Sequence, residues 1–224
     1  MLKRSAFREI RSSLGRYIAI IAIIALGVGF FAGLRVTKSA MVKTADTYIN
    51  EHGLFDYRLV STVGYDMDDV SAFAGMDGIR AVEGSFAADF LAQTENDGDV
   101  VLRAHSMMDT INTVSLVAGA LPTEDDECVV DARFYGEDAI GSVMKLSPSN
   151  DEDTLALFRY QEYRIVGIVN SVYYINYERG STSLGNGSVT GFVYIPYSGF
   201  DIDYYTDLFL LLTEGGYKIG RAHV

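Results

Sequence analysis

The sequence has few cysteines and histidines, the residues that form disulfide bonds and many metal centres. It holds one cysteine, Cys128, so no internal disulfide can form and the chain is not a disulfide-stapled secreted module. We expect Cys128 to be a small buried apolar residue rather than a reactive thiol. The three histidines, His52, His105 and His223, stand in unrelated contexts without ligand spacing, and we interpret His105 as the end of a strand.

Common catalytic motifs are also missing. No G-x-S-x-G sequence is present, so a serine hydrolase is unsupported. The glycine-rich loop from Arg179 to Ser188 lacks the Lys-Ser/Thr pair of a Walker loop, and we expect a structured loop that uses the backbone freedom of glycine. The acidic runs 124–127 and 151–153 lack the spacing of a calcium loop and are expected to be solvated. We therefore expect a non-catalytic chain without a cofactor or metal of its own.

Basic residues are scarce after the first sixteen positions. The formal net charge is −12, with 30 acidic and 18 basic residues. The N-terminal basic cluster comprises Lys3, Arg4, Arg8, Arg11 and Arg16. The acidic remainder disfavours nucleic acid as a partner, because it would repel the phosphates.

One long apolar run, residues 17–34 (YIAIIAIIALGVGFFAGL), has no charged side chain. As a helix it would span roughly 27 Å, close to the hydrocarbon thickness of a bilayer. The basic cluster before it predicts a cytoplasmic N-terminus and an extracytoplasmic main domain. A cleaved signal peptide and a buried core helix are the alternatives. The length of the run, the missing A-x-A-like site and the lack of a polar face disfavour them.

The flanks and the small residues of this run carry their own signals. Apolar residues recur at helical spacing before the span, so we expect residues 1–16 to form a basic amphipathic helix on the cytoplasmic surface, with an unstructured flank as the alternative. Small residues spaced three or four apart within the span would let another helix approach closely. This expected helix-packing set is Ala22, Ala25, Gly29 and Gly33.

An α+β domain is expected after the span. Residues 35–52 are predicted to continue the helix as a stalk, and residues 53–217 to form a sheet-rich domain with a short helix at 66–74. A lobe boundary is predicted at 147–153. The predicted strands are 55–62, 79–88, 100–105, 127–131, 143–147, 163–169, 191–195 and 208–213.

Tyrosines gather in two stretches, residues 172–177 and 194–205. Exposed tyrosines favour protein interfaces, because the ring provides contact area and the hydroxyl a polar tip. The alternative is that they pack on the sheet. The expected partner surface comprises Tyr173, Tyr174, Tyr177, Arg179 and Asn186.

Four segments together resemble a known family. SLGRYIAIIAIIALGVGFFAGLR (13–35) resembles the first span of FtsX-like ABC transporter permeases, in the large form common in Gram-positive bacteria. GALPTEDDECVVD (119–131) and YRIVGI (163–168) resemble two segments of the MacB-type extracytoplasmic core domain, and the loop RGSTSLGNGS (179–188) also looks like this subfamily.

The resemblance implies a MacB-like fold and a permease subunit that pairs with a separate ABC ATPase, as a dimer of permeases or permease halves. A further extracytoplasmic protein or peptide partner is also open. Family members carry more membrane helices than this sequence shows. Residues 219–224 (IGRAHV) match a translated sequencing adapter, so we expect residues 218–224 to be a non-native tail and the chain to be an N-terminal fragment. Two alternatives stay open: a scaffold that activates a cell-wall hydrolase, and a single-pass anchored sensor or adhesin.

Overall fold

The structure is a computed structural model that describes residues 14–94 and 98–213. The chain forms two compact units, Met1–Tyr48 and Ile49–Val224. Residues 1–13 of the predicted amphipathic segment and the predicted tail at 218–224 lie outside the described residues.

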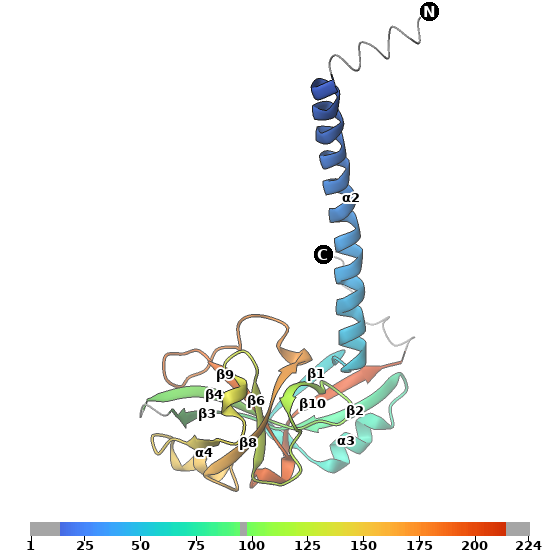
Figure 1. Ribbon diagram of the computed structural model, residues 1–224. Helices are drawn as coiled ribbons and strands as arrows, with labels where there is room; N and C mark the ends of the chain where they lie inside the picture. Colours follow the sequence, from blue (N-terminus) through green and yellow to red (C-terminus); the bar gives the residue numbers. More distant parts are fainter. Residues whose placement is uncertain (1–13, 95–97, 214–224) are drawn as a thin grey trace, which may run out of the picture. The chain divides into compact units, whose positions relative to one another are not determined.

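Helix α2, drawn in blue in Figure 1, makes up the described part of the first unit and continues for three residues beyond it. It runs without a break through Leu14–Glu51, 38 residues, and has no buried residue. Among the described residues it is the one helix long and apolar enough to cross a membrane, with a mean hydropathy of 2.5 in its most apolar stretch. The predicted span at 17–34 is helical, as is the predicted stalk from 35 to 51. A core helix would bury its apolar side chains, whereas none of those on α2 is buried, which disfavours the buried-core alternative.

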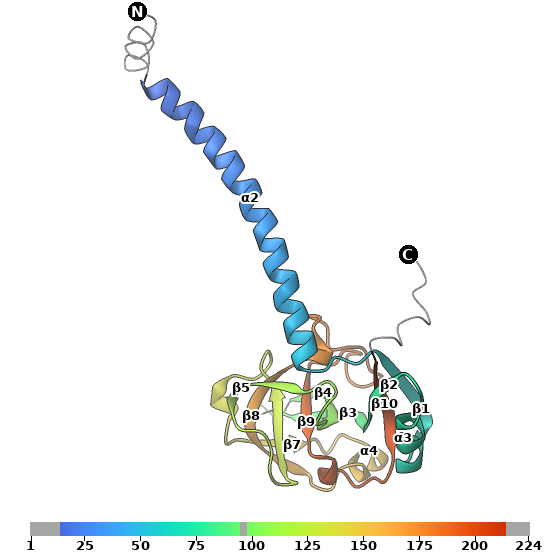
Figure 2. The ribbon, with the colours of Figure 1, turned by 90° about the vertical axis from the view of Figure 1, so that its right-hand side faces the viewer.

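The first sheet of the domain has three antiparallel strands in the order β1-β10-β2 (Figures 1 and 2). These strands are β1 (Tyr57–Tyr65), β2 (Ile79–Ser85) and β10 (Tyr205–Leu212). Helix α3 (Met67–Ala74) connects β1 to β2. The Asp66 carboxylate accepts a hydrogen bond from the Asp69 N–H, and the Asp69 carboxylate accepts one from the Asp66 N–H, forming a capping box. This confirms the predicted helix with an acidic start.

The second sheet has seven strands and closes on itself. Its order is β5-β8-β6-β9-β4-β3-β7, and β7 also pairs with β8. All strands except β5 therefore form a closed ring, and closure removes the free edges of an open sheet. The strands are β3 (Ala87–Gln93), β4 (Asp99–Ser106), β5 (Val114–Gly119), β6 (Glu127–Asp131), β7 (Val143–Leu146), β8 (Glu162–Ser171) and β9 (Gly191–Ile195).

The remaining regular elements are single turns of helix in the connections. They are α4 (Glu152–Ala156) and the 3-10 turns η1 (Glu137–Ala139), η2 (Val172–Tyr174) and η3 (Tyr197–Gly199). The Asp151 carboxylate accepts the Thr154 N–H at the start of α4, and hydrogen bonds from the Thr154 side chain and then its backbone lower the pKa of Asp151.

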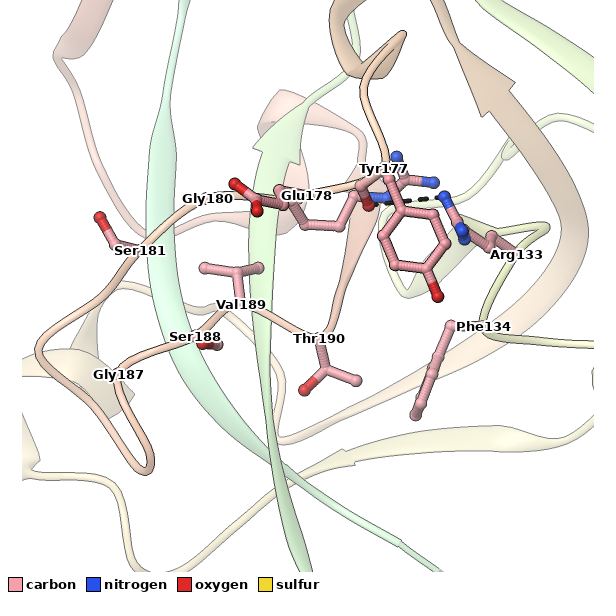
Figure 3. Close-up of a pocket in the computed structure, with 11 residues that line it drawn as sticks. Arg133, Phe134, Tyr177, Glu178, Gly180, Ser181, Gly187, Ser188, Val189 and Thr190 are labelled. Carbon is pink, nitrogen blue, oxygen red and sulfur yellow. Dashed lines mark hydrogen bonds between the residues drawn. The ribbon is translucent and has the colours of Figure 1, made fainter.

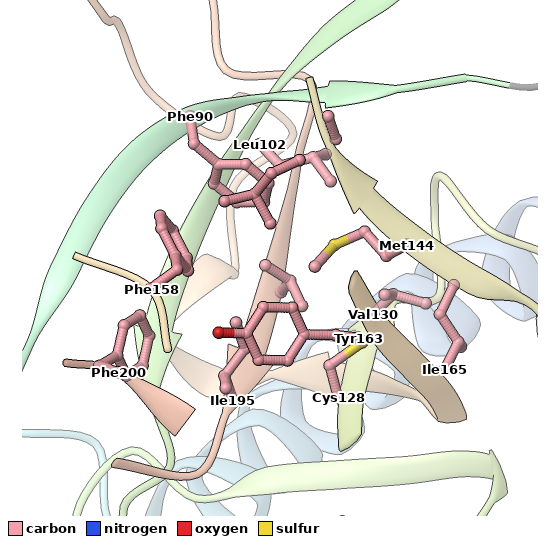
Figure 4. Packing of buried hydrophobic residues seen from close by; sticks show 14 of the residues in the cluster. Phe90, Leu102, Cys128, Val130, Met144, Phe158, Tyr163, Ile165, Ile195 and Phe200 are labelled. Carbon is pink, nitrogen blue, oxygen red and sulfur yellow. The ribbon is translucent and has the colours of Figure 1, made fainter. Parts of the chain in front are cut away.

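The ring encloses the main apolar core (Figure 4). Side chains alternate along each strand, so Leu102 and Ala104 of β4 lie in this core while their neighbours face outward. Cys128 is fully buried in it, and burial raises the pKa of its thiol, which confirms the interpretation of this cysteine as a core residue. Large side chains of the core include Phe90, Met144, Phe158, Tyr163, Ile165, Ile195 and Phe200.

The strand predicted at 79–88 is in fact two strands in two sheets. The chain leaves the small sheet after Ser85 and enters the ring at Ala87, and the buried Phe86 lies between them. The Phe86 N–H donates to the Ser106 hydroxyl at 2.9 Å, which fixes this crossing to the end of β4. The divide between the two sheets therefore lies at residue 86.

The segment 147–153, predicted as a lobe boundary, instead connects two strands of the ring. It follows β7 and precedes β8, and these strands pair with each other. The Ser147 N–H and the Asn150 side-chain amide both donate to the Leu91 carbonyl, each at 2.8 Å. These bonds tie the segment to β3, so it is a turn that connects two paired strands of one sheet.

Candidate functional site

The connection from β8 to β9, residues 172–190, contains the whole predicted partner surface; we call it the strap. It lies on the outer side of the ring, over β4 and β9. The Tyr174 ring stacks on Phe192 of β9, with ring centres 4.6 Å apart and planes 7° apart. The Tyr174 hydroxyl lies 2.5 Å from Nε2 of His105 in β4. Aromatic stacking therefore holds the start of the strap against the sheet.

His105 lies beneath the strap, in surroundings that disfavour a protonated imidazole. Its ring stacks on Tyr194 and meets the edges of Tyr173 and Tyr174. Burial, and then the nearby positive charges of Arg103 and Arg58, lower the pKa of His105 to about 3. The imidazole is therefore neutral near pH 7. It is the strand-end residue that the sequence predicted, and it works as a packing and hydrogen-bonding group.

An ion pair, Arg179 with Asp131, fixes the middle of the strap. The Arg179 side chain is 9% exposed and that of Asp131 is 1% exposed, and the fork is bidentate, with N–O distances of 2.6 and 3.0 Å. Arg179 also donates to the carbonyl oxygens of Tyr174 and Asn176. Every strong contact of this guanidinium is thus inside the protein, which makes Arg179 a structural anchor rather than a contact for a ligand.

A second arginine holds the far side of the strap. Arg103 of β4 forms a bidentate pair with Asp89 of β3, at 2.5 and 2.7 Å, and donates to the Ser181 carbonyl at 3.1 Å. Asp89 raises the pKa of Arg103 through this hydrogen bond and its charge. The strap is therefore bound to two strands of the ring, β4 and β9, and to the end of β6 at Asp131.

The glycines of the strap have the backbone conformations that the sequence predicted. Gly180, Gly185 and Gly187 have φ angles of 112°, 53° and 87°, which other residues rarely adopt. They allow a small hairpin in which Ser181 pairs with Ser188. The prediction of a structured loop that needs glycine is confirmed.

A pocket of about 700 Å³ opens between the strap and the turn after β6 (Figure 3). Arg133 and Phe134 line one side, and Tyr177 and Glu178 belong to the strap. The Arg133 guanidinium lies 3.1 Å from the centre of the Tyr177 ring, a cation–π contact, and donates to the Tyr177 carbonyl at 3.5 Å. The Tyr177 residue is 78% exposed and Phe134 is 41% exposed.

The predicted partner surface is divided by the structure. Tyr177 and Arg179 both line the pocket, whereas Asn186 is exposed and uses its side-chain oxygen to accept the Ser188 N–H. Tyr173 and Tyr174 are half-buried and pack inward, as the alternative interpretation held. Sequence reasoning missed Arg133 and Phe134. Their only signal was a basic and an aromatic residue directly after a buried strand.

The small residues of α2 stay a prediction. All four are exposed on the helix, and a Cβ added at Gly29 or Gly33 would meet nothing within 4 Å. The described helix therefore offers the close approach that the sequence indicated, without a partner being present. In the described part of the chain no cluster of His, Cys, Asp or Glu could hold a metal ion.

Comparison with known proteins finds likeness in structure only. No model of a protein family and no curated protein matches the sequence. The extracellular domain of the ABC-type transporter YknZ from Gram-positive bacteria overlaps with 68% of this chain and 75% of its own, at a TM-score of 0.44 and 12% identity.

Two further solved structures overlap in the same way. The periplasmic region of MacB from Actinobacillus actinomycetemcomitans covers 70% of this chain and 67% of its own, at a TM-score of 0.40 and 14% identity. A permease domain from Porphyromonas gingivalis covers 65% and 66%, also at 0.40 and 14%. All three are domains of permeases or ABC-type transporters, the kind of protein that the sequence resembles. Overlap at this level is partial and assigns neither substrate nor partner to this chain.

Proposed function

We propose that this chain is part of a permease subunit of an ABC transporter of the MacB/FtsX type. In this proposal α2 crosses the membrane with its N-terminus in the cytoplasm, and the domain from residue 53 lies outside. A separate ATPase binds on the cytoplasmic side and hydrolyses ATP. The chain has no catalytic role of its own and passes movement from α2 to the domain.

The observation that carries the proposal is that two segments far apart in the sequence lie side by side in the fold. Residues 119–131 and 163–168 carry the resemblance to the extracytoplasmic core domain, and they are neighbours in the fold. Strand β6 pairs in parallel with β8, and Gly119 lies opposite Gly167 at the end of β5. A Cβ on Gly119 would collide with the Val166 carbonyl, and one on Gly167 with the Ala120 carbonyl. The two glycines therefore serve one packing contact, which supports a shared core rather than chance similarity of short motifs.

The start of the domain is suited to receive movement from a helix. Helix α2 ends at Glu51, and the next residues are bonded to the segment before β5. The Thr113 N–H donates to the His52 carbonyl at 3.0 Å and the Asn112 N–H to the Gly53 carbonyl at 2.9 Å. The Asn112 side chain accepts the Phe55 N–H at 3.2 Å. Displacement of residues 52–55 would thus be passed to β5, which pairs with β8.

The small-residue face of α2 provides a place for a second membrane helix in this proposal. Ala22, Ala25, Gly29 and Gly33 lie three or four residues apart within the apolar run, so helices can approach closely there. The second helix belongs to another copy of the permease or to a further permease half.

The test combines partner capture with a linker insertion. The full chain is purified from membranes of its source cell in nanodiscs, and its partners are identified by mass spectrometry. We expect an ATPase subunit with a Walker motif, and a change in hydrogen exchange at residues 52–56 and β5 when ATP is added. A variant with six Gly and Ser residues inserted after Glu51 should keep ATP hydrolysis and lose that exchange change.

Two results would contradict the proposal. The first is recovery of the intact chain without any ATPase subunit. The second is an ATP-dependent exchange change that the flexible insertion leaves intact, because movement would then reach the domain by another route.

A further inference from the structure

We propose that the pocket between the strap and the Arg133–Phe134 turn binds a short zwitterionic peptide that carries an apolar side chain. The peptide carboxylate would bind Arg133, its ammonium group would face Glu178, and its side chain would lie against Phe134 and Val189. The inference does not rest on the transporter proposal, because it concerns only the residues that line this pocket.

The charge of Arg133 is the first argument. Between residues 49 and 213 the described part of the chain has eight Lys and Arg side chains, and six of them form ion pairs. Only Arg80 and Arg133 among those eight have no ion pair. An unpaired guanidinium on a strongly acidic domain is a local site for an anionic group, and its planar fork fits a carboxylate.

The side chain of Arg133 is oriented by contacts within the protein. Its guanidinium lies on the Tyr177 ring, and its own backbone N–H donates to Asp131 at 3.0 Å. A long side chain that is ordered in advance loses less entropy when a ligand binds. Stacking leaves the donors at the edge of the guanidinium plane available to an incoming carboxylate, because the ring covers only its face.

Glu178 provides the opposite charge in the same pocket. Its side chain is exposed and lines the pocket, and among the described residues it forms neither an ion pair nor a side-chain hydrogen bond. A simple anion would be repelled by this carboxylate, whereas a ligand with one charge of each sign would satisfy both groups. This pair of unpaired charges therefore selects a zwitterion over an anion.

The walls and floor of the pocket set the rest of the ligand. Phe134 presents an exposed ring, and Val189 is buried at 6% exposure and lies in the lining. Hydroxyl groups of Ser181, Ser188 and Thr190 also line the pocket and can bond a peptide group. A pocket of about 700 Å³ has room for a dipeptide but not for a folded partner.

The test uses alanyl-phenylalanine as the probe, titrated by calorimetry into the full chain in nanodiscs. We expect binding of the dipeptide, and binding weaker by about tenfold or more when its carboxylate is amidated or its amine acetylated, because each change removes one charge-assisted contact. Alanyl-glycine should also bind more weakly, because it lacks the side chain for Phe134.

Matched variants assign the contacts. Arg133→Gln should weaken dipeptide binding about tenfold and have little effect on the amidated probe, and Arg133→Lys should fall between. Glu178→Gln should weaken binding of the free amine and have little effect on the acetylated probe. Arg80→Gln is the control, since it removes the other unpaired arginine and changes the net charge equally.

The inference is overturned if alanyl-phenylalanine fails to bind at millimolar concentration to the folded chain. It is also overturned if the amidated and free dipeptides bind equally, or if Arg80→Gln and Arg133→Gln have the same effect. Both arginines are exposed, so folding of these variants is expected and is checked by circular dichroism.

Discussion

Helix α2 and the strand ring use the same side chains in opposite surroundings. Phe30 of α2 is 70% exposed and Ile24 is 60% exposed, whereas Phe90 and Ile195 of the ring are fully buried. Burial of each such side chain in the ring contributes about 1.5–3 kcal/mol to folding. The same groups on α2 contribute nothing to the stability of a lone helix in water. The comparison shows that the domain carries its own core, while α2 needs an apolar solvent.

The largest expected effect tests whether that solvent is a lipid bilayer. Ile21→Asp together with Ile24→Asp should raise the free energy of membrane insertion by about 6–8 kcal/mol, because each charge near the helix centre is strongly disfavoured. Extraction of membranes with alkaline carbonate should release this variant and retain the wild type. The control, Met41→Asp with Val42→Asp, changes the same helix beyond its apolar run and should stay in the membrane. Retention of both variants would contradict the assignment of 17–34 as a span.

The next effect separates buried from exposed aromatic rings within the domain. Phe90→Ala should lower the free energy of unfolding by about 3–5 kcal/mol, since it leaves a cavity in the closed ring. Phe134→Ala removes a half-exposed ring at the pocket and should cost less than about 1 kcal/mol. Urea unfolding followed by circular dichroism measures both. Equal losses would mean that the ring core does not dominate the stability of the domain.

The strap is expected to depend on its buried ion pair. Asp131→Ala leaves the Arg179 charge buried without its partner and should cost about 3 kcal/mol, seen as faster hydrogen exchange across residues 172–190. Glu162→Ala is the matched control, because its ion pair with Lys145 is exposed and worth under about 1 kcal/mol. If exchange in the strap is the same in both variants, the ion pair does not anchor it.

The smallest expected effect is the change in the free energy of unfolding that His105 causes over one pH unit. Its folded pKa of about 3 lies below the ordinary value of 6.5, so the unfolded chain binds the extra proton between these values. The contribution of neutral His105 to the free energy of unfolding is fully present above pH 6.5. It is lost as the pH falls toward 3, by up to about 1.4 kcal/mol for each pH unit. Comparing unfolding at pH 6.5 and 5.5 in wild type and His105→Gln measures it, with His52→Gln as the control for loss of an imidazole. An unchanged slope in His105→Gln would contradict the buried neutral state.

Short strands with an apolar centre and full burial could be predicted from the sequence, and peripheral strands could not. The bounds of β6 and β9 agree with the prediction, because each strand is a short continuous run whose residues are all buried. Strand β5 was missed, since it is largely exposed and lacks that pattern. The crossing between the two sheets at Phe86 could not be predicted, because the spacing of apolar residues along 79–88 stays the same where the chain passes from one sheet to the other.

Prediction of the site failed where distant segments meet. The glycine loop was expected because its conformation depends on local residues. Arg133 and Phe134 lie more than forty residues before Tyr177 of the strap, and no local pattern links them to it. Tyr174 was predicted on the surface because exposed tyrosines favour interfaces. Its ring instead packs inward, because it stacks on Phe192 and its hydroxyl hydrogen-bonds to His105.

The position of β10 has a consequence for biosynthesis. This strand lies between β1 and β2 in the small sheet, although it follows them by more than a hundred residues. On the ribosome, β1 and β2 must therefore wait for β10 until the ring has been synthesised, and the backbone N–H and C=O groups that pair with β10 lack this partner during that interval. Pairing of β10 with β1 and β2 completes the small sheet, and it brings together the first and last strands of the described part of the domain.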